Sequence, residues 1–242
     1  MIKIENTEVY GFEAAIRGMR SPLNSWEKSD SCYCNGRGSA CDNCCMKPND
    51  DYAPCYFARE EKGKLYVVGA NDLNLMKKLV SAGSDHSKFM RMITVTCDIT
   101  APRYWWAEFD TYKVGTVRNS CSTMHTIHQK EFTLDDFSHE HLDRYKDIIP
   151  DHVDGNPYDI LNSIIECLNY AREYYLETKD KKCWWQIIQL LPQSYNQRAT
   201  VQLNYQVLRN MYHARKNHKL DEWRTFCEWA KDELPYSNLI TD

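Results

Sequence analysis

The sequence lacks a strong excess of charge of either sign. Thirty basic side chains stand against 34 acidic ones, so the net charge is −4. A nucleic-acid groove or a face that binds an anionic membrane usually needs a basic excess. We therefore expect no nucleic-acid or membrane partner, while a local basic pocket for a phosphate stays open.

Long apolar runs are also absent. No stretch approaches the roughly 20 apolar residues that cross a bilayer, and the opening MIKIENTEVYGFEAAIRG has no apolar core or cleavage site of a secretory signal. These absences favour a cytoplasmic protein. The chain has 242 residues, 43% of them hydrophobic, which is enough for a single domain over residues 1–242.

Cysteine is abundant by contrast, and six of the eleven cysteines fall in one polar segment. These six are Cys32, Cys34, Cys41, Cys44, Cys45 and Cys55. The segment holds almost no apolar side chain that could be buried, so its ordering requires cross-links. We interpret residues 30–56 as an inserted loop that binds a metal, because the Cys41-x-x-Cys44 spacing is typical of structural zinc sites. An iron–sulfur cluster, free thiols and disulfides are the alternatives.

The other cysteines are scattered, and in a reducing compartment we expect them to be small buried hydrophobic residues. They are Cys97, Cys121, Cys167, Cys183 and Cys227.

Periodicity predicts strands in the first half of the chain and helices in the second, without βαβ alternation, which is typical of an α+β fold. We expect a short strand and a short helix within residues 2–20, strands at 65–68 and 89–100, and helices at 72–80, 157–178, 181–191, 200–217 and 221–232. Asn71-Asp72 is expected to cap the first of these later helices. Thr100 and Pro102 are expected to begin a further helix, as its cap and its first turn.

The predicted helix from Thr200 places polar and apolar side chains on one stripe. Asn204, Leu208, Met211 and Arg215 share that stripe at 100° per residue. A buried amide and a buried guanidinium need partners. They are either satisfied by neighbouring groups as part of the structure, or they line a ligand pocket in which Arg215 binds an anion.

A second cluster of polar residues is the segment RNSCSTMH. Arg118, Ser120, Ser122, Thr123 and His125 in it could form a phosphate cradle. A solvated Ser/Thr-rich turn is the alternative.

Several of these residues occur at spacings found in a known family. Leu191-Pro192 followed by Asn204, Asn210 and Arg215 resembles the C-terminal region of the flavin-dependent thymidylate synthases. Counting from Ala101-Pro102, the R-H-R signature of that family falls on Thr111-Tyr112-Lys113, and its next serine falls on Thr116. His86 falls on a family histidine that lies by the flavin. The chain departs from the signature at Thr111 and Tyr112, and the later motif serine falls on Cys121 or, with one inserted residue, on Ser122.

The resemblance implies an antiparallel sheet with a helical C-terminal half. It also implies a homotetramer that converts dUMP to dTMP, with methylenetetrahydrofolate as carbon donor and NADPH reducing FAD. It assigns flavin binding to His86, Tyr112, Lys113, Asn204 and Asn210, nucleotide binding to Glu108, Thr116 and Ser122, and polarisation of the pyrimidine to Arg215. Two alternatives stay open: a flavin- or nucleotide-binding homologue with another pyrimidine-modifying reaction, and a non-catalytic binding protein that contains zinc.

Overall fold

The computed structural model describes residues 1–33, 66–144, 149–150 and 154–242. The chain divides into two compact units. Unit 1 comprises Met1–Thr7, Cys97–Val201 and Asn217–Phe226, and unit 2 comprises Glu8–Thr96, Gln202–Lys216 and Cys227–Asp242. No helix in the described ranges is long and apolar enough to cross a membrane.

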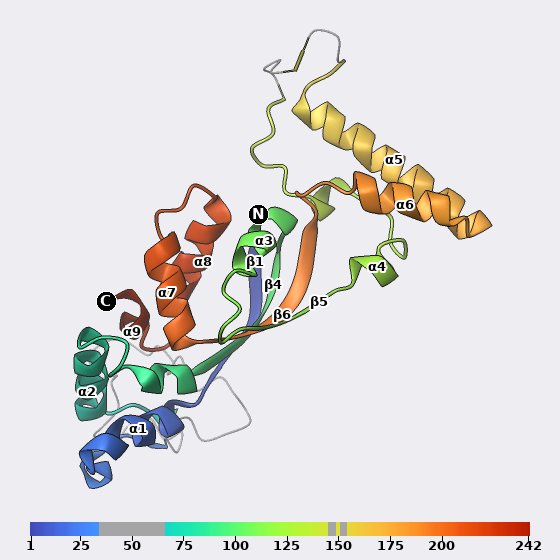
Figure 1. Ribbon diagram of the computed structural model, residues 1–242. Coiled ribbons are helices and arrows are strands. Elements are labelled where there is room, and N and C mark those ends of the chain that lie inside the picture. Colours follow the sequence, from blue (N-terminus) through green and yellow to red (C-terminus); the bar gives the residue numbers. More distant parts are fainter. Residues whose placement is uncertain (34–65, 145–148, 151–153) are drawn as a thin grey trace, which may run out of the picture. The chain divides into compact units, whose positions relative to one another are not determined.

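An antiparallel four-stranded sheet in the order β1-β4-β6-β5 is accompanied by many helices, which confirms the α+β prediction (Figure 1). Its strands are β1 (Lys3–Tyr10), β4 (Thr94–Pro102), β6 (Asn196–Asn204) and β5 (Val117–Ser120). Along β4 the side chains of Val95, Cys97 and Ile99 are buried and alternate with half-buried threonines and Asp98. The alternation predicted for this strand is therefore confirmed, although the strand begins later because Lys88–Met92 form a 3-10 helix, η3.

Two helix starts predicted in the first half of the chain are wrong. β4 continues through Pro102, and helix α3 (Arg103–Phe109) begins only after it. A residue before proline is biased toward extended backbone, and this bias on Ala101 prevails over the cap predicted at Thr100. Helix α2 (Ala70–Ser81) begins before Asp72, whose side chain is buried in the first turn rather than capping from outside.

Unit 1 contains an aromatic core under α3. Trp105 packs against Trp106 and Phe109 of its own helix and against Trp223 and Phe226. The last two residues belong to α8 (Asp221–Asp232), a helix predicted correctly at both ends.

A second core in unit 1 lies beneath a helical hairpin of α5 (Pro157–Thr178) and α6 (Lys181–Leu190), which lie side by side (Figure 1). Its buried members are Ile127, Phe132, Phe137, Leu161, Ile165, Leu168, Ile187 and Leu191. Leu161, Ile165 and Leu168 recur at helical spacing and give α5 one buried face, in the helix predicted over residues 157–178. A short helix, α4 (Thr123–Thr126), and a 3-10 turn, η4 (Leu134–Asp136), precede the hairpin.

Unit 2 is built on α1 (Phe12–Arg20), α2, α7 (Tyr205–Arg215) and α9 (Asn238–Thr241), with short 3-10 helices η1 (Ser21–Leu23) and η2 (Trp26–Lys28). Phe12 packs edge-on against Tyr205 and Tyr236. Gly11 precedes α1 with φ +95°, and a Cβ there would lie 2.1 Å from the carbonyl oxygen of Met92. The close approach of α1 and η3 therefore requires glycine at this position.

A buried polar network in unit 2 holds the chain just before β2. Asp72 accepts hydrogen bonds from Arg20 Nε at 2.6 Å, from Ser29 Oγ at 2.7 Å and from Ser31 Oγ at 2.6 Å. Strands β2 (Cys32–Tyr33) and β3 (Tyr66–Val67) then pair antiparallel. The chain thus leaves at Tyr33 and returns beside it at Tyr66.

Candidate functional site

The residues predicted for the site divide between the two units. Unit 2 holds His86, Asn204, Asn210 and Arg215, whereas unit 1 holds Glu108, Tyr112, Lys113, Thr116 and Ser122. The two groups are described separately.

Asn204 does not lie on a helical stripe, so that prediction is wrong. Residues 196–204 form β6, and Asn204 is the N-cap of α7, where its side-chain oxygen accepts the backbone N–H of Val207 at 3.0 Å. The buried positions Val201 and Leu203 alternate with exposed Gln202, as in a strand with one buried face. Leu208 and Met211, by contrast, are buried on α7 as predicted.

Asn210 is exposed on α7, where it is bonded to Gln206 of the preceding turn. The side-chain nitrogen of Gln206 donates to the side-chain oxygen of Asn210 at 3.2 Å. The Gln206 oxygen in turn accepts from Ser87 Oγ at 3.0 Å. His86, the residue before Ser87, is exposed, and its backbone N–H donates to the Gly83 carbonyl at 3.1 Å. Ser87, the neighbour of His86 in the sequence, therefore contacts the helix that carries Asn210.

Arg215 is half-buried in the last turn of α7. Its charge reaches α8, where the Cys227 thiol is buried. Burial, and after it the charge of Glu228, raises the pKa of this thiol to about 11, against the opposing charges of Arg215 and Lys216. Cys227 is therefore a neutral thiol at physiological pH.

In unit 1, Glu108 projects from α3 into contact with the start of α8. Its Oε2 accepts from the indole N–H of Trp223 at 3.1 Å and lies 3.5 Å from Nε2 of His218. His218 Nδ1 accepts the backbone N–H of Leu220 at 3.2 Å, so the ring hydrogen is on Nε2 and faces the carboxylate. Tyr112 packs edge-on against the same indole, with ring centroids 6.0 Å apart.

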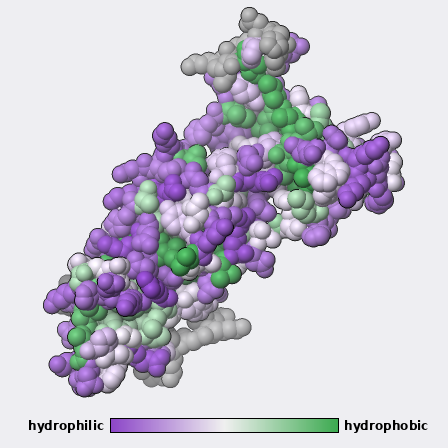
Figure 2. All heavy atoms as spheres, viewed as in Figure 1, coloured by the Kyte–Doolittle hydropathy of each residue, from purple (hydrophilic) through white to green (hydrophobic). Residues whose placement is uncertain are grey.

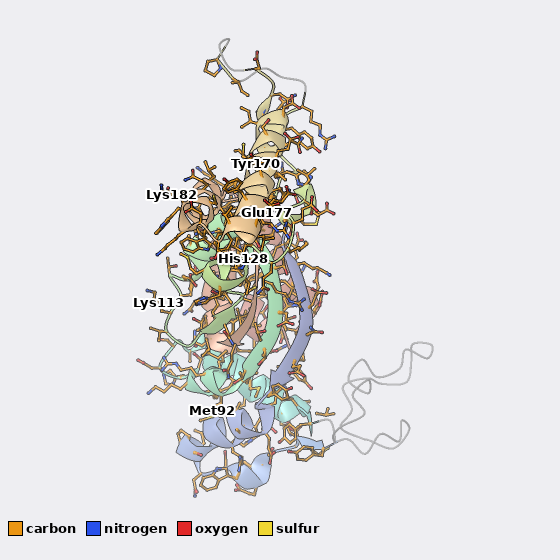
Figure 3. The ribbon with its side chains drawn as sticks, turned by 90° about the vertical axis from the view of Figure 1, so that its right-hand side faces the viewer. Met92, Lys113, His128, Tyr170, Glu177 and Lys182 are labelled. Carbon is orange, nitrogen blue, oxygen red and sulfur yellow. The ribbon has the colours of Figure 1, made fainter. Side chains whose placement is uncertain are left out.

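The hydroxyl groups in the signature region bond mostly to nearby backbone. Thr116 Oγ1 donates to the Tyr112 carbonyl at 2.6 Å, and Thr111 Oγ1 donates to that of Glu108 at 2.7 Å. Lys113 is exposed, and its side chain stands at the surface (Figure 3). Of this segment, the lysine ammonium is thus the group most available to a charged ligand.

A cavity of about 140 Å³ lies beside α4. Its lining residues are Cys121, Ser122, Thr123, Thr126, Ile127, Tyr195, Asn196, Gln197 and Arg198. Ser122 caps α4 by accepting the N–H of His125 at 3.3 Å. Of the five residues predicted as a phosphate cradle, only Ser122 and Thr123 line this cavity.

Arg118 is not among the residues that line the cavity, but it bonds one of them, Gln197. Its guanidinium lies 4.0 Å from the centre of the Trp106 ring and bonds Asp110 at 2.6 Å. It also donates to Gln197 at 2.9 Å, and Gln197 donates to the Cys121 carbonyl at 2.7 Å. The role expected for Arg118 as a phosphate ligand does not fit these contacts.

The predicted metal ligands lie largely outside the described residues. Only Cys32 is described, half-buried in β2, whereas Cys34, Cys41, Cys44, Cys45 and Cys55 are not. Within the described ranges, no group of three or more histidine, cysteine or carboxylate side chains is arranged to hold a metal. The metal site therefore stays a prediction.

Among the scattered cysteines, Cys97 and Cys227 are buried as expected. Cys121 and Cys167 are exposed and Cys183 is half-buried, so the expectation of burial is wrong for these three. Cys121 precedes the short helix α4, and Cys167 and Cys183 lie on the hairpin helices α5 and α6.

Comparison with known proteins identifies the fold. No protein-family profile and no curated protein sequence matches the chain. Among solved structures, a crystal structure of the flavin-dependent thymidylate synthase from Helicobacter pylori with FAD and dUMP matches with a TM-score of 0.60 at 14% identity, over 98% of this chain and 97% of that one. A second crystal structure of the same enzyme, also with FAD and dUMP, gives the same TM-score and identity over 100% and 97%.

The chain has the fold of a flavin-dependent thymidylate synthase. The resemblance noted in the sequence is therefore supported at the level of the fold. The roles assigned to individual residues stay predictions, because 14% identity shows the fold alone.

Sequence reasoning missed four residues that contact the predicted site residues. Ser87 and Gln206 fix Asn210, and His218 and Trp223 fix Glu108. A signal existed for Gln206, because positions four apart on a helix are neighbours. No local signal existed for Trp223, which lies 115 residues from Glu108.

Proposed function

We propose that the chain is a flavin-dependent enzyme that converts dUMP to dTMP, with methylenetetrahydrofolate as carbon donor and NADPH as reductant. One observation carries this proposal: nearly the whole chain aligns with nearly the whole of an enzyme crystallised with FAD and dUMP. Agreement over both full lengths favours a shared domain plan rather than one shared motif.

The residues predicted for the cofactor have suitable chemistry. FAD presents carbonyl oxygens, ring nitrogens and a diphosphate, which accept hydrogen bonds and carry negative charge. Asn210, His86 and Lys113 are all exposed, and each can donate a hydrogen bond. When bound, FAD would supply the hydride chemistry, and the protein would supply binding, orientation and charge.

Arg215 is the proposed contact to the pyrimidine. A guanidinium is always charged and would favour the anionic form of the base. It also sits at the C-terminal end of α7, where the helix dipole stabilises a cation and so helps to hold it in place.

The Arg215→Ala variant tests this role by titration calorimetry with dUMP. We expect a loss of affinity of about tenfold or more with an unchanged circular dichroism spectrum, since a charge-assisted bond contributes about 1.5–3 kcal/mol. Lys216→Ala, which removes the neighbouring exposed cation, is the matched control and should bind normally. Equal losses in both variants, or unfolding of Arg215→Ala, would argue against a specific contact.

Glu108 supports an alternative reaction on a pyrimidine other than uracil. By resemblance a glutamine occupies this position, and an amide both donates and accepts, whereas an ionised carboxylate only accepts. Trp223 and His218 both face this carboxylate with N–H groups, so it acts as an acceptor toward each of them. A base edge with more donors than uracil has would suit this carboxylate, so another pyrimidine-modifying reaction is the alternative.

The homotetramer is part of the proposal, and the α5–α6 hairpin offers a surface for it. Tyr170, Tyr174 and Trp185 are 72%, 48% and 44% exposed. Figure 3 shows Tyr170 at the surface with Glu177 on α5 and Lys182 on α6, and Figure 2 shows apolar residues gathered along α5. Sedimentation equilibrium would show a tetramer if the proposal holds and a monomer if it fails.

The decisive experiment is spectroscopic and then enzymatic. The purified protein with added FAD should retain a flavin band at about 450 nm after gel filtration, and it should form dTMP from dUMP, methylenetetrahydrofolate and NADPH. Protein that stays colourless would refute the flavoenzyme and favour the non-catalytic, zinc-containing alternative. Flavin binding without dTMP would favour the second reaction class, to be tested with dCMP.

A further inference from the structure

The polar face of α7 carries a directed chain of hydrogen bonds. Gln206 and Asn210 are four residues apart, so their side chains meet on one face of the helix. The amide nitrogen of Gln206 donates to the Asn210 oxygen at 3.2 Å. An amide has one oxygen and one nitrogen at its two ends, so the direction of this bond is set by what the Gln206 oxygen contacts.

That oxygen lies beside the hydroxyl of Ser87, whose single hydrogen has two acceptors within reach: the Gln206 oxygen at 3.0 Å and the more distant Ser84 carbonyl at 3.5 Å. Ser87 is only 3% exposed, and its hydroxyl donates to the Gln206 oxygen at 3.0 Å. The backbone of Ser87 is itself held, because its N–H donates to Gly83 at 3.1 Å and its carbonyl accepts from Met90 at 3.0 Å. The serine therefore anchors the oxygen end of Gln206 and turns its nitrogen toward Asn210.

The side chain of Asn210 presents only hydrogen-bond donors to solvent. Its oxygen is used by Gln206, and the described residues provide no further partner for its nitrogen. The exposed end of Asn210 is therefore a pair of N–H donors.

We propose that Ser87 and Gln206 are positioning residues that hold Asn210 as a hydrogen-bond donor, so that it binds an acceptor atom of the flavin, a carbonyl oxygen or an unprotonated ring nitrogen. This inference rests on the proposed flavin binding. It adds two residues to the site and specifies the chemistry of the atom that Asn210 binds.

The Gln206→Glu variant tests the direction of the hydrogen bonds that run from Ser87 through Gln206 to Asn210. A glutamate still accepts from Ser87, but it has no N–H for Asn210. Asn210 must then turn its nitrogen to the carboxylate and present its oxygen to the ligand. We expect the affinity for FAD, measured by quenching of flavin fluorescence, to fall about tenfold, as for a mismatched polar contact. The affinity of Gln206→Glu should then lie within about threefold of the affinity of Asn210→Ala.

Two controls separate the effect of reversing the Asn210 amide from the effect of the added negative charge. Gln202→Glu adds the same charge on exposed β6 and should change the affinity less than about twofold. Repeating the titrations at about 0.05 M and 0.5 M NaCl screens a long-range charge effect but leaves a local mismatch. Two results would overturn the proposal. One is a loss of FAD affinity in Gln206→Glu that disappears at high salt. The other is unchanged FAD affinity in both Asn210→Ala and Gln206→Glu.

A second readout does not depend on flavin. Exchange of the Asn210 side-chain amide protons with water, followed by NMR, should be fast in the unmodified chain and slowed in Gln206→Glu, where the carboxylate accepts one proton. Ser87→Ala should give an intermediate effect, because it releases the Gln206 oxygen. If the protein binds no FAD but the exchange rates change as expected, the proposed function fails and the series of hydrogen bonds from Ser87 to Asn210 stands. Unchanged exchange rates would overturn that series of hydrogen bonds itself.

Discussion

Replacing Asp72 by asparagine should destabilise unit 2 strongly. The Asp72 side chain has no exposed surface, and that of its partner Arg20 is 5% exposed. Besides the three side-chain donors, Asp72 accepts the backbone N–H groups of Asp30 and Ser31, both at 3.2 Å. Asparagine keeps the volume but leaves the Arg20 charge buried without a counter-charge.

Breaking a buried ion pair on one side costs about 3–5 kcal/mol. For a chain of this length each kcal/mol lowers Tm by about 2–4 °C. We therefore expect Asp72→Asn to unfold roughly 6–20 °C below the unmodified protein in calorimetry. The exposed Asp85→Asn is the matched control and should unfold normally.

The pH dependence gives an independent check. Burial alone would raise the pKa of Asp72, but hydrogen bonds from Ser31, Ser29 and Arg20, together with the Arg20 charge, outweigh it and lower the pKa. A lowered native pKa adds stability above the unfolded value of about 3.9, and this stability is lost as pH falls below that value. The difference in Tm between the two proteins should thus shrink below about pH 4. A difference under about 2 °C at pH 7, or one that does not change with pH, would refute the argument.

Three further predictions follow from local geometry. Gly11→Ala should cost about 1–3 kcal/mol in urea unfolding, because φ is positive there and the new Cβ would meet the Met92 carbonyl; the same change at exposed Gly83, where a Cβ meets nothing, isolates the contact. Asn204→Ala should cost about 1 kcal/mol through the lost cap of α7, and Asn204→Asp should recover most of it. Replacing residues 34–65 by Asn-Gly should leave Tm within a few degrees, since Tyr33 and Tyr66 are already paired and a two-residue turn can join them; failure to fold would show that the segment is required.

Elements whose ends carry local signals were predictable. Asn156 caps α5 with a capping box to Asp159, and Pro157 follows in the first turn, so both the start and the apolar stripe follow from neighbouring residues. The segment 200–204 was not predicted, because its period-2 pattern spans few residues and joins a helical pattern that begins at Tyr205. An asparagine at that junction is itself a helix-start signal, and it marks the true boundary.

The site was predictable only in part, for a related reason. Asn204, Asn210 and Arg215 have sequence spacings that can be recognised, whereas the partners of Glu108 come from α8 and the residues just before it, more than a hundred residues away. Hydrogen bonds between distant elements have no periodic signature. Arg118 shows the opposite error. The polar segment around it suggested a phosphate ligand, but its guanidinium bonds Asp110 and stacks on Trp106.

The pairing of β2 with β3 has a consequence for engineering and for divergence of the chain. Closing a loop costs entropy that grows only with the logarithm of its length, about 0.6 kcal/mol for each doubling. Once Asp72 and the β2–β3 pair hold the two ends together, the scaffold is nearly indifferent to how much chain lies between Tyr33 and Tyr66. This position therefore suits the insertion of a whole reporter domain whose termini lie close together.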